Sequence, residues 1–138
     1  MTGASIAVQP LNPLHPRVIG LGATLLIAAF ASDLIYWWTV RGAWETLSIW
    51  LLTVGLIVAA LSGLALVIDV LRGQAGNIQW GRFLALAAAA LLSLLNAFVH
   101  SRDGYTAVVP QGLALSAIVT IILLVVGRRG WRLDEPRS

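Results

Sequence analysis

The chain has 138 residues, of which 59% are hydrophobic and 11% are charged. So much apolar surface exceeds what a small globular core can bury, which excludes an ordinary soluble domain and predicts that lipid surrounds the protein. All nine basic residues are arginines and the net charge is +3. Because the arginines stand at the edges of apolar runs, as in membrane proteins, we expect no nucleic-acid partner. With no cysteine in the sequence, disulfides, thiolate metal sites and thiol nucleophiles are excluded.

Four apolar stretches are long enough to cross about 30 Å of hydrocarbon, which takes about 20 helical residues. They lack the alternation of barrel strands, so we predict an all-α fold, an integral membrane bundle of four helices. Short connections favour antiparallel neighbours and hence an up-down-up-down order. The chain is predicted to be a single transmembrane domain with an extended leader at 1–16, helices at about 18–40, 46–71, 83–100 and 108–127, and a polar tail at 128–138.

The distribution of arginines predicts how the bundle is oriented. Only Arg41 and Arg102 lie on one side of the four predicted helices, and seven arginines lie on the other. Because positive residues of short loops stay in the cytoplasm, both termini should be cytoplasmic in a multi-pass protein of the bacterial inner membrane. The side of Arg41 and Arg102 is then periplasmic. The seven are Arg17, Arg72, Arg82, Arg128, Arg129, Arg132 and Arg137.

Small residues recur every four positions on the second predicted helix, at Gly55, Ala59 and Gly63. Such a stripe lets two helix backbones approach closely in lipid, where no hydrophobic effect draws helices together. One interpretation is that the stripe packs the bundle internally. The other is that it forms the contact face of a homo-oligomer.

The deepest ionisable residue is Asp33, on the order of 10 Å from the outer end of its predicted helix. A carboxyl at that depth must be neutralised, paired or hydrated, so it should face the bundle interior. Asn96 and His100 lie four residues apart on one face of the third predicted helix, with Ser93 on the same stripe one turn deeper. Since the first and third helices both end outside, we predict an intramembrane polar cluster of Asp33, Ser93, Asn96 and His100. Its role is either a clamp between helices or a proton or ligand site.

Two rims of polar residues flank the predicted helices. In the cytoplasmic rim, Asp69 and Arg72 have the i, i+3 spacing of a helical pair, so an interfacial ion pair or a cap would explain them. In the periplasmic rim, residues 101–104 have the composition of a polar turn. The cytoplasmic rim consists of His15, Arg17, Asp69 and Arg72, and the periplasmic rim of Arg41, Arg102, Asp103 and Tyr105.

Two histidines in a membrane bundle raise the question of a haem. His15 and His100 are predicted at opposite ends of the bundle, about 30 Å apart. One protomer therefore cannot hold a haem between them. A haem with a single histidine ligand, or a quinone held by His100 and Asp33, stays open. The spacings predict no metal site and no catalytic constellation, which favours a protein that is not an enzyme.

Four motifs carry a resemblance to a known family: His15-Pro16, then Asp33-Leu34 after sixteen residues, a glycine- and alanine-rich helix ending at residues 63–69, and NAFVHSRDGYTAVVPQGLALS at residues 96–116. Together they resemble the bacterial membrane proteins grouped as domain of unknown function 2231. Many relatives carry a second histidine where this chain has Gly20, which removes one candidate ligand. The resemblance implies a four-helix integral membrane fold. Because some members lie beside periplasmic redox enzymes, it also implies an electron-transfer or anchoring role.

Two functions from different classes fit the sequence. The first is a non-enzymatic membrane subunit or anchor that docks a partner, such as a periplasmic oxidoreductase, at its outer rim. The second is an oligomeric transporter or proton-passing bundle that uses Asp33 and His100. Four helices leave little room for a pore, so the second function requires several copies of the chain.

Overall fold

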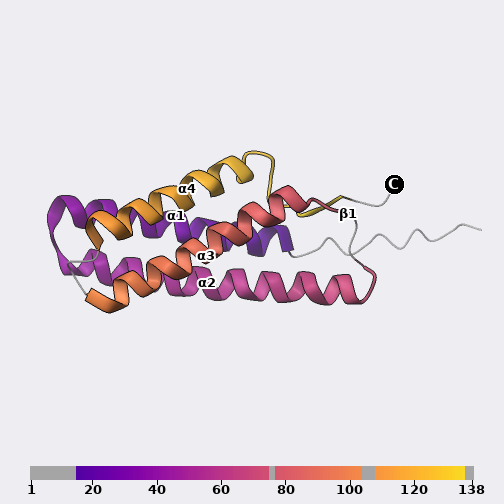
Figure 1. Cartoon of the computed structure of the whole chain (residues 1–138), viewed down its shortest axis with the longest axis horizontal. Coiled ribbons are helices and arrows are strands. Elements are labelled where there is room, and N and C mark those ends of the chain that lie inside the picture. The colour runs from indigo at the N-terminus through magenta and orange to yellow at the C-terminus, as the bar shows by residue number, and fades with distance from the viewer. Residues whose placement is uncertain (1–14, 75–76, 104–107, 136–138) are drawn as a thin grey trace, which may run out of the picture.

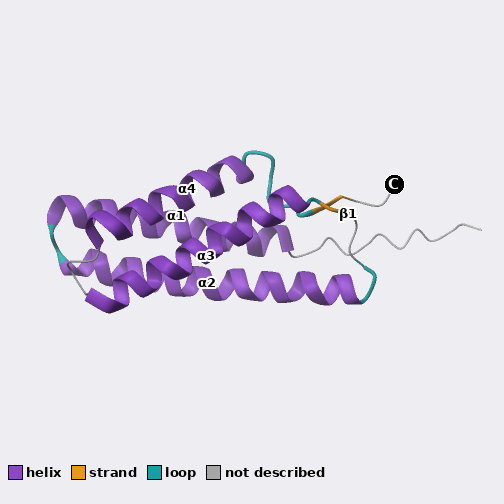
Figure 2. Ribbon diagram, in the orientation of Figure 1, coloured by secondary structure: helices purple, strands orange, loops and turns teal. Residues whose placement is uncertain are grey.

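The computed structural model describes residues 15–74, 77–103 and 108–135 of the chain. Figures 1 and 2 show long helices that lie lengthwise beside one another, with a very short ladder of strands at one end. The helices are α1 (His15–Thr39), α2 (Gly42–Leu71), α3 (Trp80–Asp103) and α4 (Leu113–Gly127), with the short helix η2 (Val108–Gly112) directly before α4 and the strands β1 (Asn77–Ile78) and β2 (Asp134–Glu135).

Four helical stretches are long and apolar enough to cross a membrane: residues 16–39 in α1, 42–71 in α2, 80–102 in α3, and 109–127, which combines most of η2 with α4. Their outward faces carry many large apolar side chains, among them Leu64, Leu84 and Val125, each more than half exposed. A soluble protein would hide such side chains, whereas lipid accommodates them. The prediction of an all-α fold with four membrane-length helices is confirmed. The direction in which each helix crosses the membrane stays a prediction.

Three of the four helices begin earlier than the apolar pattern alone predicts, whereas the fourth predicted helix, 108–127, starts with η2 and becomes α4 only at Leu113. α1 begins at His15 rather than at residue 18, and α2 begins at Gly42 rather than at residue 46. The prediction that residues 41–45 form a connection is therefore wrong for residues 42–45, and Glu45 lies in the first turn of α2. An acidic residue there is favourable because it faces the positive end of the helix dipole. Likewise α3 extends beyond the predicted 83–100 at both ends, since polar residues are tolerated in terminal turns.

The turn between α1 and α2 is tight and places a branched residue in an unusual conformation. Val40 has a φ of 53°, the left-handed region that glycine normally occupies at the end of a helix. Its N–H donates to the carbonyl of Tyr36 at 2.7 Å, which closes α1. Arg41 is extended and directly precedes α2. The connection is thus only two residues long, and it fixes how α1 and α2 meet.

A short antiparallel ladder joins the start of α3 to the end of α4. Asn77 pairs with Glu135 and Ile78 with Asp134, although residues 134–135 were predicted only as part of a polar tail and residues 77–78 lie between two predicted helices. The Arg82 guanidinium donates to the carbonyls of Val126, in the last turn of α4, and of Gly130, just after the helix; carbonyls at a helix C-terminus need such outside donors. Strands of two residues are too short for an alternating pattern, so periodicity could not indicate them.

The apolar core contains small and medium side chains from all four helices. Its buried members are Ala23, Leu26, Ala29, Leu52, Ala89, Val119 and Leu123. α1 and α2 pack closest, because Gly55 of α2 lies against α1: a Cβ at Gly55 would come within 2.9 Å of Leu26 Cδ2. By contrast, a Cβ at Gly63 would meet nothing within 4 Å. Gly55 therefore serves packing within the protomer, and self-association through this stripe stays a prediction.

The different surroundings of the two glycines lead to a first prediction. Gly55→Val should lower the free energy of unfolding by about 1–3 kcal/mol, because the larger side chain overpacks the α1–α2 contact. Gly63→Val, the matched control on the same helix, should change it by less than about 0.5 kcal/mol. Tryptophan fluorescence during unfolding in SDS measures both. Equal losses in the two variants would contradict the packing described for Gly55.

Candidate functional site: a buried polar network

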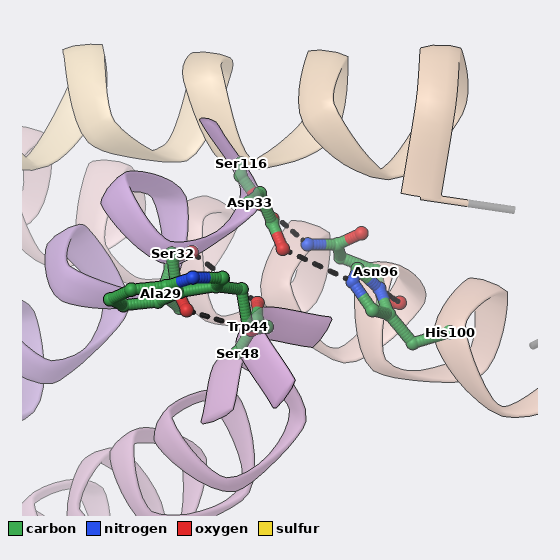
Figure 3. A network of polar contacts seen from close by, with 8 residues as sticks. All are labelled: Ala29, Ser32, Asp33, Trp44, Ser48, Asn96, His100 and Ser116. Atoms are coloured by element: carbon green, nitrogen blue, oxygen red, sulfur yellow. Dashed lines mark hydrogen bonds and ion pairs between the residues drawn. The ribbon is translucent and has the colours of Figure 1, made fainter. Parts of the chain in front are cut away.

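The central contact of the site joins Asp33 of α1 to His100 of α3. His100 Nε2 lies 3.3 Å from Asp33 Oδ1, and both side chains are fully buried. Figure 3 shows the two side chains pointing toward each other between the helices. Asp33 lies six residues before the end of α1, on the order of 9 Å along the helix. An acid and an imidazole thus meet inside the bundle, away from its apolar outer faces.

Two further residues complete the network around the Asp33 carboxyl (Figure 3). Ser116 of α4 donates its hydroxyl hydrogen to Asp33 Oδ2 at 2.7 Å. Asn96 Nδ2 donates to the Ser116 hydroxyl, also at 2.7 Å. On the other side, His100 Nδ1 lies 3.0 Å from the carbonyl oxygen of Asn96. Side chains of α1, α3 and α4 therefore form one connected set of hydrogen bonds.

The geometry restricts where the protons of the Asp33–His100 pair lie. A carbonyl only accepts hydrogen bonds, so His100 Nδ1 must carry a hydrogen toward Asn96. With Ser116 donating to Oδ2, the remaining mobile proton lies between Asp33 Oδ1 and His100 Nε2. The pair is then either carboxylate with imidazolium or carboxylic acid with imidazole. Both states are neutral as a pair, which is the form that burial in an apolar bundle requires.

A second acid lies beside the pair on the first turn of α2. Glu45 is only 5% exposed, and it interacts electrostatically with both His100 and Asp33. Two serines fasten α1 to α2 next to it: Ser32 Oγ donates to the Trp44 carbonyl at 2.7 Å, and Ser48 Oγ to the Ala29 carbonyl at 3.3 Å. The site therefore has three titratable groups, contributed by α1, α2 and α3.

Two buried oxygens in this region have no hydrogen-bond partner among the described residues. They are Asn96 Oδ1 and Thr120 Oγ1. Thr120 lies one turn along α4 from Ser116 and is 7% exposed, and Asn96 is fully buried. Buried polar atoms without a partner are uncommon in folded proteins and cost free energy. Asn96 thus gives the network one further acceptor, and the Thr120 hydroxyl, one turn away, can either donate or accept.

The structure brings together three of the four residues predicted as an intramembrane cluster. Asp33, Asn96 and His100 share the network, whereas Ser93 is buried but donates to the Ala89 carbonyl of its own helix at 2.8 Å. Ser93 therefore makes none of the bonds between helices. The role of the cluster stays a prediction.

The rim residues lie at the helix ends. Arg41 and Arg102 are exposed, at the start of α2 and in the last turn of α3. Asp103 ends α3, but its side chain and the whole of Tyr105 lie outside the described residues. At the opposite end Arg17 and Arg72 are exposed and Asp69 is half-buried, while the side chain of His15 is not among those described.

Sequence reasoning missed Ser116 and Glu45. Ser116 is one of several small polar residues on α4, and without the register between α3 and α4 nothing distinguished it. Glu45 was assigned to a loop because glycine, tryptophan and acid together interrupt the apolar run. A usable signal was the spacing of Glu45 and Ser48, which lie three residues apart and hence on one face if the helix already includes Glu45.

The arrangement also bears on the candidate cofactors. Both ring nitrogens of His100 are engaged, Nε2 with Asp33 and Nδ1 with Asn96, so an iron would have to displace one of these contacts. The described residues contain no group of three histidine, cysteine or acidic side chains placed to hold a metal ion. A quinone headgroup would find polar partners at Asp33 and His100, but neither residue lines the apolar cavity between α1, α2 and α3.

The fold and the site define a class: a four-helix membrane protein with a polar network buried among its helices. The chain belongs to the family described as predicted membrane protein, domain of unknown function 2231 (DUF2231), which matches residues 11–135. The resemblance drawn from the sequence motifs is confirmed. No curated protein and no solved structure matches the chain.

Gly20, where the resemblance implies a second histidine in many relatives, has a packing role in this chain. A Cβ at Gly20 would come within 2.8 Å of Trp131 Cδ1, and one at Gly127 within 2.6 Å of Trp131 Cζ2. The indole therefore lies against both glycines, between the beginning of α1 and the end of α4. A larger residue at position 20 would have to displace Trp131.

A double-mutant cycle tests the central contact. Asp33→Ala and His100→Ala should each lower the free energy of unfolding by about 3–5 kcal/mol, because each leaves the other group buried without its partner. The double variant should lose less than the sum, with a coupling of about 1–3 kcal/mol. Unfolding in SDS, followed by tryptophan fluorescence, provides the three values.

Ser93→Ala is the control for this cycle, since Ser93 is equally buried but bonds only within α3. It should cost less than about 1 kcal/mol and show no coupling to Asp33→Ala. Additive losses for Asp33 and His100 would contradict a direct contact.

Proposed function

We propose that the protein is a non-enzymatic membrane subunit that docks a partner at one face of the membrane. Its Asp33–His100 pair takes up and releases a proton at that face, and the partner uses this proton exchange. The proposed setting is the bacterial cytoplasmic membrane, with both termini in the cytoplasm and the pair near the periplasmic face. A redox partner suits this role, because electron transfer to carriers such as quinones is coupled to proton uptake or release.

The observation that carries the proposal is the buried contact between Asp33 Oδ1 and His100 Nε2. Ionisable residues inside a membrane bundle are expensive and most often mark proton or ion pathways. A clamp between helices would need only neutral groups, such as Asn96 and Ser116, which provide hydrogen bonds without the cost of a buried charge. A carboxyl and an imidazole that share a proton can also gain or lose a proton, which a clamp of neutral groups cannot do.

The surroundings support exchange from one side only. Toward the α1–α2 turn, Glu45 lies in the first turn of α2 and interacts electrostatically with the pair. Toward the opposite end, the interior between the helices is mainly apolar, with Leu26, Leu52 and Leu123 in the core. The buried polar side chains there, Ser93, Thr120 and Ser62, are neutral hydroxyl groups. The proposed route for a proton is therefore by way of Glu45, the one titratable side chain next to the pair among the described residues.

The rim beside the pair has the composition of a docking surface. Trp38 is 90% exposed and Val40 is 74% exposed, and the exposed Arg41 and Arg102 flank the same end of the bundle. Aromatic residues and arginine are enriched where proteins bind each other. An acidic soluble partner would complement the two arginines.

The transport alternative uses the same pair but requires a continuous path. Within one protomer the apolar core interrupts such a path, so transport needs polar groups from a second copy. Gly63, which has open space beside it, leaves room for such a contact. We propose the oligomeric transporter as the second candidate on that observation.

Infrared difference spectroscopy tests the proton site directly. The protein in lipid nanodiscs, titrated between about pH 5 and 9, should show a coupled carboxyl and imidazole signal that disappears in both Asp33→Asn and His100→Gln. Asp69→Asn, at the other end of the bundle, is the matched control and should keep the signal. Glu45→Gln should keep it but slow its response to a rapid pH change.

Two outcomes would count against the one-sided site. An unchanged spectrum in Asp33→Asn would show that the pair does not exchange protons in this range. Net proton transfer across liposomes that Asp33→Asn abolishes would favour the transporter instead.

Docking makes a separate prediction. A photo-cross-linking amino acid at position 38 should give a discrete adduct with an acidic soluble protein in native membranes. The adduct should fall at least about fivefold in Arg41→Glu/Arg102→Glu, since the reversed charges repel such a partner. The control position is Trp80, which is 63% exposed at the opposite end. Equal labelling from both positions would contradict a docking rim.

A further inference from the structure

A cavity of about 230 Å³ lies between α1, α2 and α3, away from the polar network. It exists because its walls carry small side chains, including Gly22, Ala59, Gly63 and Ala87. Figure 1 shows α2 and α3 diverging toward the end where β1 lies, and the cavity occupies this part of the bundle. Phe83 and Leu133 line it near that end, where α3 begins and the chain approaches β2.

The cavity has almost no polar group to hold water. Ser62 is the one lining residue with a polar side chain, and its hydroxyl already donates to the Val58 carbonyl at 2.8 Å. A water molecule inside a protein needs two to four polar partners, whereas an apolar cavity of about 150 Å³ stays dry and binds a hydrocarbon. Inside a membrane the available hydrocarbon is the acyl chain of a lipid.

The charge at this end of the bundle indicates which lipid. Seven arginines and only three acids, Asp69, Asp134 and Glu135, belong to this side of the predicted bundle. Arg72 is exposed just after α2, and Arg132 is exposed beside the lining residue Leu133. Arg132 directly precedes Leu133, and Arg72 follows the helix whose Leu66 also lines the cavity, so a headgroup at this end would meet a basic surface. Guanidinium groups bind phosphate well. Anionic headgroups are attracted to such basic clusters at the membrane surface.

We propose that the cavity is a binding site for one anionic phospholipid, with an acyl chain between α2 and α3 and the headgroup at Arg72 and Arg132. Ala59 and Gly63, which the sequence suggested as a self-association face, are then walls of the lipid site. The site is separate from the Asp33–His100 network, so its existence does not depend on the proposed proton exchange.

Native mass spectrometry of lipid retention tests the site. The protein is reconstituted in nanodiscs with equal amounts of phosphatidylglycerol and phosphatidylcholine, then released into mild detergent. The natural chain should retain one phospholipid and prefer phosphatidylglycerol. Gly63→Leu fills the cavity and should reduce retention about tenfold, the change expected from losing roughly 55 Å² of apolar contact. Arg72→Gln should keep the acyl chain but lower the preference for phosphatidylglycerol about fivefold.

Ala60→Leu is the matched control, because Ala60 is exposed on the same helix and does not line the cavity. It should retain lipid as the natural chain does. Equal retention in all variants would show only surrounding lipid and would overturn the proposal. Retention of a second copy of the chain in place of lipid, lost in Gly63→Leu but not in Ala60→Leu, would overturn it in favour of self-association.

Discussion

The contact between Asp33 and His100 is the constraint on which the rest of the site depends. Either group alone, buried in an apolar bundle, would cost several kcal/mol. Together, with a proton between them and hydrogen bonds from Ser116 and to Asn96, they form a neutral unit that the bundle interior can hold. The positions of α1, α3 and α4 at this end follow from that requirement, because each helix contributes a member of the network.

The two ends of the bundle are held by different means. At the network end, serine hydroxyls and the two-residue turn at Val40 and Arg41 join α1 to α2. At the other end, the β1–β2 ladder and the Arg82 guanidinium join α3 to α4. The apolar cavity lies between these two ends, lined mainly by α1, α2 and α3. The polar site and the cavity therefore occupy separate parts of the bundle, and we assign them separate functions.

Much of this architecture was predictable from the sequence because lipid imposes simple rules. The length of the apolar runs predicted four helices. The depth of Asp33 and the four-residue spacing of Asn96 and His100 predicted that these side chains lie together. What could not be predicted depends on register and on short-range backbone detail. The choice of Ser116 needs the alignment of α3 with α4, and Glu45 needs the start of α2, which polar residues obscure. The ladder at Asn77–Ile78 is too short to have a pattern, and the role of Gly20 became visible only with Trp131 packed against it.

The most direct measurement of the central claim is a solid-state NMR distance in lipid bilayers between the carboxyl carbon of Asp33 and Nε2 of His100. A dipolar coupling that corresponds to roughly 4 Å, one bond beyond the hydrogen-bond distance, is the expected result. A separation beyond about 7 Å, too long for even one water molecule to bridge the two groups, would contradict the account.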